Sequence, residues 1–362
     1  MDKKIHITFF YLICLQTCVL LAGCEKDLDI PHHHGPQSAE PYWCYYAPEK
    51  EILPNGQTAA TIFIGGIQNG TDQKSAVMTF GNKIGTPNLN FDLGNIYVVP
   101  KSDSTHHPNN NSQYWIFGHQ TDNILPIRFK VKNHADGDFL DDGQSFFTGG
   151  FHGYKNMTSI DATPTLYEKE KVVIVDGDTM RMGEIRKGNH IQIIVRNLLQ
   201  ASNTQKKDGQ GRYAMEQDIY MDFCRDTAFV RVDFTPLEDI LAYQIDGLGF
   251  YNDLDSIQFI DSRTKMGIYK NNIVNRADKS VKAIRQFDSE YKLDAFIDPH
   301  YGIGDLKYNS ESYNAQTTEV QKSYFHLLAS PNDTPRTFTK GETISFRGGY
   351  VFSFKGIPGC RP

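Results

Sequence analysis

The chain lacks the signatures of several common protein classes. It has no C-x-x-C pair, so a structural zinc site is not predicted. A Gly-x-Ser-x-Gly elbow and a phosphate-cradling loop are also absent. Its 37 basic residues are outnumbered by 43 acidic ones, which gives a formal net charge of −6. Nucleic acid is therefore not an expected partner, because phosphate binding needs a basic surface.

Long apolar runs are scarce, and the single run that approaches membrane length lies at the N-terminus. Phe9–Leu21 follows two lysines and is too short to span a bilayer comfortably, since spanning takes about 20 apolar residues. The segment Leu20–Cys24, reading Leu-Leu-Ala-Gly-Cys, resembles the lipobox of bacterial lipoproteins. The resemblance implies a signal peptide over residues 1–23, lipidation of Cys24 and membrane attachment through that lipid. A plain secretory signal is the alternative.

The residues after Cys24 suggest a surface-exposed tether. Glu25–Asp29 is acidic and resembles the signal that exports some lipoproteins of the Bacteroidetes, which implies the outer membrane and the cell surface. Residues 24–41 are rich in proline, glycine and polar residues, which make a poor core, so we expect a flexible tether. Its three adjacent histidines, His32–His34, offer either a metal site or a solvated spacer.

Cysteine is too scarce for a disulfide framework. Once the signal is removed and Cys24 is lipidated, Cys44, Cys224 and Cys360 remain, and an odd number cannot all pair. One bridge is compatible with an oxidising envelope. Which cysteines would form it is left open by the sequence.

The body of the chain reads as strands. Hydrophobic residues make up 39% and aromatics 12%, enough for a real core. Runs such as Thr61–Ile64 and Ala76–Phe80 are β-branched or aromatic and end at glycine, and Phe229–Phe234 alternates as a half-buried strand should. We therefore predict one antiparallel all-β domain over residues 42–362, a two-sheet sandwich or jelly roll with long loops.

Several local features are predicted within this domain. Asp176-Gly177 should form a hairpin turn. Residues 343–354 resemble a hairpin around Gly348-Gly349, and residues 278–287 have the apolar spacing of a short helix. The polar, asparagine-rich segment 262–319 is expected to be an elaborated loop region.

The main candidate site is Gly149–Met157, where glycines bracket one histidine and polar side chains follow. A second histidine-bearing segment, Gly118–Asp122, ends another predicted strand. We expect a shared cleft with His119, His152, Tyr154 and Arg128 as catalytic candidates, and Gln120, Lys155, Asn156 and Trp115 as ligand-binding residues. Such side chains suit β-elimination from a uronic-acid polysaccharide, in which cations neutralise the carboxylate and a histidine or tyrosine removes the α-proton. The alternative is that these histidines only hydrogen-bond strand ends and loops.

A second candidate site is the acidic loop, residues 136–143. Asp136, Asp138 and Asp142 offer oxygen ligands for Ca²⁺, and glycines allow the loop to bend. The loop departs from an EF-hand because Leu140 takes a ligand position and no glutamate closes it. An acidic surface turn without metal is the alternative.

These features lead to one main functional hypothesis and two alternatives. The main hypothesis is a lipid-anchored envelope protein that binds glycans, because binding needs fewer coincident groups than catalysis. The first alternative is an enzyme of polysaccharide lyase type using the His/Tyr/Arg groove. The second is a structural or adhesive envelope subunit, which a long unpaired edge strand would favour. The sequence leaves the glycan and the oligomeric state open.

Overall fold

The structure is a computed structural model that describes residues 41–67, 74–102, 115–117, 122, 124, 126–140, 144–224, 226–261, 267–270, 275–276, 281–304, 314–317, 322–329 and 334–354. Every described residue belongs to one compact unit of the chain, Pro36–Pro362. The described residues are mainly strand, with short 3-10 turns. None of their helices is long and apolar enough to cross a membrane.

The described strands form three antiparallel sheets. In spatial order, the six-stranded sheet contains β10 (Ile185–Gly188), β1 (Tyr42–Ile52), β2 (Thr58–Ile67), β3 (Lys74–Asn82), β4 (Phe91–Pro100) and β5 (Trp115–Phe117). The ten-stranded sheet contains β16 (Tyr269–Lys270), β15 (Ser256–Ile260), β18 (Ala283–Phe287), β19 (Tyr291–Ile297), β23 (Ile344–Phe354), β13 (Thr227–Pro236), β12 (Tyr213–Cys224), β11 (Ile191–Gln200), β8 (Leu166–Val175) and β9 (Asp178–Thr179). The seven-stranded sheet contains β17 (Asn275–Arg276), β20 (Asn314–Thr317), β21 (Lys322–Ala329), β14 (Ile240–Tyr251), β6 (Ile127–Val131) and β7 (Phe147–Thr148), with β22 (Arg336–Phe338) also paired to β14.

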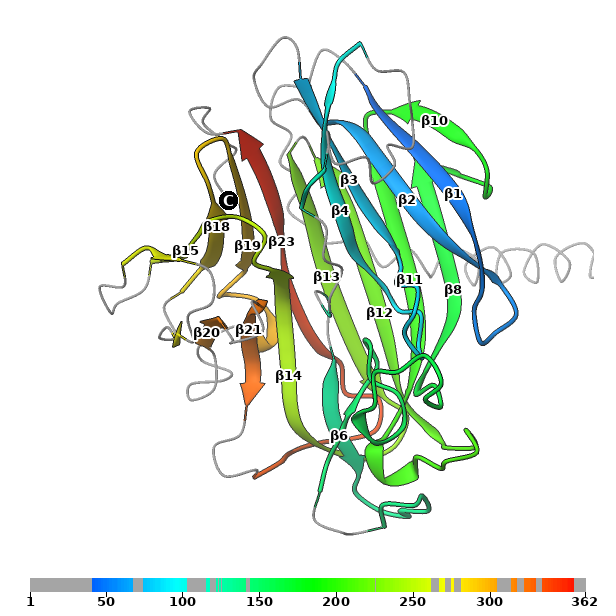
Figure 1. The fold of residues 1–362 in the computed structure, drawn as a ribbon. Coiled ribbons are helices and arrows are strands. Elements are labelled where there is room, and N and C mark those ends of the chain that lie inside the picture. The colour runs from blue at the N-terminus through cyan, green and yellow to red at the C-terminus, as the bar shows by residue number, and fades with distance from the viewer. Residues whose placement is uncertain are drawn as a thin grey trace, which may run out of the picture. The chain divides into compact units, whose positions relative to one another are not determined.

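The predicted sandwich is confirmed, with one layer divided between two sheets. The six- and seven-stranded sheets both lie against the ten-stranded sheet (Figure 1). Phe80 of β3 contacts Phe223 of β12 with ring centroids 5.3 Å apart. The Tyr350 hydroxyl of β23 donates a hydrogen bond to the Gly249 carbonyl of β14 at 3.0 Å. A single large cluster of buried side chains draws on all three sheets and forms the core between the layers.

The core follows from alternation along the strands. In β13, Val230, Val232 and Phe234 point into the core, while Arg231 and Asp233 lie on the other face. Full burial of each such apolar side chain contributes roughly 1.5–3 kcal/mol to stability. The strand predicted at Phe229–Phe234 is therefore confirmed, and it extends over Thr227–Pro236.

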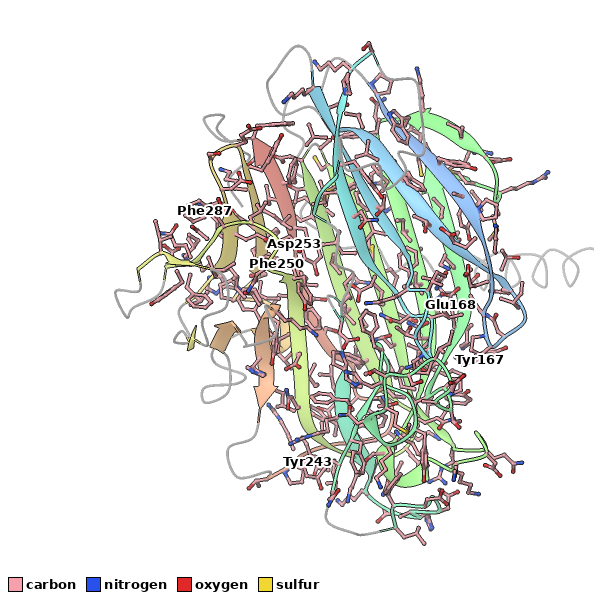
Figure 2. The ribbon with its side chains drawn as sticks, in the orientation of Figure 1. Tyr167, Glu168, Tyr243, Phe250, Asp253 and Phe287 are labelled. Atoms are coloured by element: carbon pink, nitrogen blue, oxygen red, sulfur yellow. The ribbon has the colours of Figure 1, made fainter. Side chains whose placement is uncertain are left out.

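One ion pair lies inside the sandwich. Glu168 of β8, labelled in Figure 2, pairs with Lys171 at 3.0 Å, and the two side chains are 4% and 3% exposed. Lys171 also donates to the Asn82 side-chain oxygen at 2.7 Å, and the Asn82 amide donates to Glu168 at 3.1 Å. The Lys171 ammonium lies over the Phe91 ring, and burial lowers its pKa. The pair is thus held by partners from β3 and β4 of the opposite layer.

The local predictions have mixed outcomes. The Asp176-Gly177 turn is confirmed, since both residues have positive φ (50° and 88°) and connect β8 to β9. The hairpin around Gly348-Gly349 is wrong, because both glycines lie within the continuous strand β23. A Cβ on Gly348 would lie 2.0 Å from the Phe296 carbonyl oxygen. These glycines therefore allow neighbouring strands to approach closely, and they do not form a turn.

The predicted helix is also wrong. Where it is described, residues 281–287 run into strand β18, whose neighbours are β15 and β19. The predicted loop region 262–319 contributes β16 to β20 where it is described. In β18, the most deeply buried side chains lie at a spacing of two along the strand. In a segment this short, the positions of the apolar residues fit a strand and a helix equally well, so the sequence pattern does not distinguish them.

Candidate functional site

The seven-stranded sheet carries a set of polar side chains on the face that points away from the core. In β21, alternation buries Phe325 and Leu327 in the core. The same alternation places Lys322, Tyr324 and His326 on the opposite face, where each is half-buried. This strand is the basis of the candidate site.

The two neighbouring strands add to the same face. Arg128 lies in β6 between fully buried neighbours and is the cross-strand partner of Gln244 in β14. Register shifts interrupt the β14–β21 ladder on both sides of Asp246, and they leave Asp246 directly opposite His326. Such irregularities re-aim side chains at the point where pairing changes.

Asp246 and His326 form a close pair. His326 Nδ1 lies 2.8 Å from Asp246 Oδ1, and the Gln244 side-chain amide donates to both carboxylate oxygens at 2.9 and 3.2 Å. The His326 and Asp246 side chains are 12% and 9% exposed. The Tyr324 ring meets the His326 ring edge-on at 4.9 Å. In the tautomer in which Nδ1–H donates to the Asp246 carboxylate, Nε2 is the accepting nitrogen.

A second aspartate–histidine pair lies beside Lys322. His152 Nε2 is 2.9 Å from Asp122 Oδ2, the Phe151 backbone N–H donates to Asp122 Oδ1 at 2.6 Å, and Lys322 Nζ is 3.6 Å from Oδ2. Burial acts to raise the pKa of Asp122, but Lys322, His152 and the Phe151 N–H together outweigh it and lower the pKa to about 2. Asp122 is therefore a buried anion near neutral pH.

Lys322 connects the two pairs. Its ammonium lies 5.4 Å from the centre of the Tyr324 ring, and Tyr324 contacts His326. Arg128 lies 5.8 Å from the ring of Tyr243, which is labelled near the β6 end of β14 in Figure 2. We call this arrangement the polar row, and it consists of Arg128, Gln244, Asp246, His326, Tyr324, Lys322, Asp122 and His152.

A further lysine lies next to the polar row. The Lys83 ammonium sits 3.9 Å from the centre of the Phe151 ring. Burial lowers the pKa of Lys83, as does nearby Lys322, while Asp122 and Asp92 act in the opposite direction. Two ammonium groups, those of Lys83 and Lys322, thus lie near the Asp122 and Asp92 carboxylates, and they are the cations that this part of the face offers to an anionic ligand group.

The segment Gly149–Met157 has the tight backbone that its glycines predict. Gly149 and Gly150 have φ of 72° and 51°, and the His152 N–H donates to the Gly149 carbonyl at 3.0 Å. The Asn88 side-chain amide donates to the carbonyls of Gly150 and His152, at 3.0 Å each. The Phe147 ring of β7 lies 5.2 Å from the His152 ring. His152 is therefore held firmly beside β6 and β7.

The predicted set around His152 is divided in the structure. Tyr154, Lys155 and Asn156 form the 3-10 turn η1 (Tyr154–Asn156). The Tyr154 hydroxyl donates to Asp138 at 3.0 Å, and the Lys155 backbone N–H donates to a glutamine side chain. His119 and Gln120 lie outside the described residues, and Trp115 is described only as the first backbone position of β5. Of the predicted catalytic residues, the polar row contains His152 and Arg128.

The acidic loop has cationic and hydrogen-bonding partners where it is described. The Asp136 carboxylate pairs with Arg212 at 2.7 Å, and Asp138 accepts hydrogen bonds from Tyr154 and from the Lys207 backbone N–H. Asp142 lies outside the described residues. Within the described ranges, no group of three or more His, Cys, Asp or Glu side chains is placed to hold a metal. Calcium binding here remains a prediction.

The outer face of the ten-stranded sheet holds a second group of charged residues. Asp218 and Asp233 are cross-strand partners on β12 and β13, and burial raises the pKa of Asp218. Arg196 approaches Asp218 at 3.9 Å, and Arg231 approaches Asp233 at 3.4 Å. Each of these two carboxylates thus has an arginine beside it, and opposite charges placed side by side on neighbouring strands stabilise a sheet. This group is explained by its contribution to stability, so we regard the polar row as the better site candidate.

Most members of the polar row were not predicted from sequence. His326, Asp246 and Gln244 were missed, as were Lys322 and the role of Asp122. The run Tyr324–Leu327 was the available signal, because its residues, Tyr-Phe-His-Leu, place tyrosine and histidine at alternate positions with purely apolar residues between and after them. The partners of these residues lie on other strands, and no local pattern indicates them.

Comparisons with known proteins identify no family for this chain. No protein-family profile and no curated protein matches the sequence. Among solved structures, similar folds include an α-galactosidase from Lactobacillus brevis (TM-score 0.39, 9% identity, 84% of this chain and 40% of that chain) and a galactose mutarotase-like protein from Clostridium acetobutylicum (TM-score 0.39, 9% identity, 87% and 99%). This chain spans well under half the length of that α-galactosidase. At such low identity and TM-score, these likenesses do not bear on the function of this chain.

Proposed function

We propose that the chain is a lipid-anchored cell-envelope protein that binds acidic glycans along the polar row. The supporting observation is the set of cations along the polar row, with Lys322 beside Asp122 and near Lys83 at one end and Arg128 opposite Gln244 at the other, next to imidazole and amide groups. Ammonium and guanidinium groups bind carboxylates and sulfates, and imidazole and amide groups bind hydroxyls. The Tyr324 ring adds an apolar surface of the kind that packs against a sugar ring.

Binding is tested by calorimetry with polygalacturonate, alginate and chondroitin, and with neutral glucan as the comparison polymer. We expect the acidic polymers to bind and the neutral one to bind weakly. Arg128→Gln should weaken binding on the order of 10-fold or more at low salt, because a hydrogen bond to a charged group contributes about 1.5–3 kcal/mol. Lys169→Gln is the matched control, since Lys169 pairs with Glu216 on the ten-stranded sheet. Equal affinity for acidic and neutral polymers would contradict the proposal.

The anchor is tested separately from the ligand. Cys24→Ser should release the protein from membranes, because that thiol is the expected site of lipidation. Cys18→Ser, in the same leader but outside the Leu20–Cys24 motif, is the matched control. Detergent partitioning measures the outcome, and protease treatment of intact cells tests exposure at the surface. Membrane retention of the Cys24→Ser protein would refute the lipobox interpretation.

The structural-subunit alternative would use the sheet edges. The strands at the six edges, β10, β5, β16, β9, β17 and β7, are described as only two to four residues long. β9 pairs with β8 only at Ile174 and Val175, so part of β8 also lies along that edge. We favour ligand binding on a sheet face because the polar row places cationic, imidazole and amide side chains there.

A further inference from the structure

We propose that the His326–Asp246 pair makes the polar row a catalytic site, at which a bound uronate polymer is cleaved by β-elimination. This inference rests on the proposed binding of acidic glycans and adds a reaction to it. The observation that carries it is the geometry of the pair, in which Asp246 Oδ1 lies 2.8 Å from Nδ1 of His326 and the Gln244 amide, 3.4 Å from that nitrogen, donates to the same carboxylate.

An aspartate in this position has two effects on histidine. It holds the tautomer in which Nε2 is free to accept a proton, and it stabilises the imidazolium that forms when the proton arrives. Gln244 donates to both carboxylate oxygens, so the Asp246 side chain has little freedom to turn away. Asp246 and Gln244 are therefore positioning residues, and His326 is the group that would meet the substrate.

His152 is less suited to this role, although it also pairs with an aspartate. Its Nε2 is the nitrogen that faces Asp122, and that carboxylate is already bound by Lys322 and the Phe151 N–H. The other ring nitrogen, Nδ1, is buried without a hydrogen-bond partner among the described residues. The second pair therefore fixes the loop and Lys322, and His326 is the better proton acceptor.

The proposed reaction requires no oxidant and no second substrate. His326 Nε2 takes the proton from C5 of the uronate, and the electron pair of that C–H bond forms a double bond between C4 and C5. The C4–O bond breaks, its electron pair stays on the leaving oxygen, and the Tyr324 hydroxyl protonates that oxygen. Water then accepts the proton from His326 and returns one to Tyr324. The products are a new chain end and a 4,5-unsaturated uronate.

The cations of the polar row explain why the substrate should be a uronate. Removal of the C5 proton places negative charge on the adjacent carboxylate, and a cation held against that carboxylate stabilises the charge as it develops. Lys322 lies next to Tyr324, and Arg128 is the cross-strand partner of Gln244. A neutral sugar has no group that would use these cations.

The test uses the full-length protein and whichever of the three acidic polymers binds in calorimetry. Wild type should produce the ultraviolet absorbance of an unsaturated uronate. His326→Asn should lower turnover by about 10²–10⁴-fold, the range for loss of a general base, while leaving affinity within about threefold. Asp246→Asn is the second variant, and it should lower kcat and shift the pH profile with little change in KM. His190→Asn, in the histidine–aspartate pair with Asp222 on the other layer, is the control.

Three outcomes would overturn the inference. If a polymer binds and wild type forms no unsaturated product, the site binds only, and the proposed function stands without the reaction. If product forms and His326→Asn retains full turnover, the catalytic base lies elsewhere. If none of the acidic polymers binds, both this inference and the proposed function fail.

Discussion

Asp122 provides the sharpest test of the site's electrostatics. Its carboxylate is 5% exposed and is bound by His152, Lys322 and the Phe151 N–H. The perturbation is Asp122→Asn, which keeps nearly the same shape and an oxygen acceptor for Phe151. The substitution removes the negative charge that faces Lys322 and His152. Any change in stability that depends on pH must therefore come from the lost ionisation.

The expected magnitude follows from the lowered pKa. The pKa of Asp122 falls from an ordinary 3.8 to about 2 in the folded protein. Each pKa unit corresponds to about 1.4 kcal/mol, so ionised Asp122 contributes roughly 2 kcal/mol to the free energy of unfolding. Because the folded pKa is the lower one, this contribution is complete well above pH 3.8. It is lost as the pH falls from about 5 toward about 2.

The assay is urea unfolding followed by circular dichroism, from about pH 7 down to the lowest pH at which both proteins remain folded. Wild type should exceed Asp122→Asn by about 2 kcal/mol at neutral pH, and the difference should narrow as the solution is acidified. Asp178→Asn, an exposed change on β9, is the control and should leave the pH dependence unchanged. If the difference in free energy of unfolding between wild type and Asp122→Asn stays constant with pH, the reasoning is refuted. The substitution would then destabilise the protein through altered packing and hydrogen bonding, and not through the lost charge.

Three further predictions concern the core, a glycine and the acidic loop. Lys171→Met should lower the free energy of unfolding in urea by about 3–5 kcal/mol, because it leaves Glu168 buried without a counter-charge. Adding Glu168→Gln should recover much of that loss. Equal stability of the single and double variants would contradict this prediction. Gly348→Ala should lower the free energy of unfolding by about 1–3 kcal/mol, because its Cβ would meet the Phe296 carbonyl. Gly267→Ala is the control and should leave the free energy of unfolding unchanged, because the space around Gly267 is open. If the acidic loop binds calcium, millimolar Ca²⁺ should raise the melting temperature and EDTA should reverse the rise; no shift would remove that prediction.

The strands and the fold class were predictable because their signals are local. Residues 229–234 alternate at a spacing of two, and the buried positions of β13 follow that alternation. Asp176-Gly177 supplies the positive φ that a tight hairpin needs. The tight backbone around His152 was predictable for the same reason, since glycines at positions 149 and 150 adopt conformations open to few other residues.

The errors arose where one local pattern has two structural solutions. Gly348 and Gly349 suggested a turn, but their missing side chains serve the close approach of β13 and β19 on either side. Residues 283–287 have apolar positions that fit a helix or a strand, and pairing with β15 and β19 decides for the strand. In both cases the deciding contact comes from a segment far away in the chain.

The sequence by itself determined many of the strands, the Asp176-Gly177 turn and the residue types available for chemistry. It placed His152 in a tight glycine loop and predicted that the Gly118–Asp122 segment would lie near it, but it did not indicate that Asp122 is the residue that meets the histidine. Only the tertiary structure decided that Asp246 would meet His326, 80 residues further along the chain, because register shifts in β14 turn the aspartate toward β21. Strand periodicity is a property of neighbouring residues, whereas the partner across a sheet depends on the path of every loop between the strands.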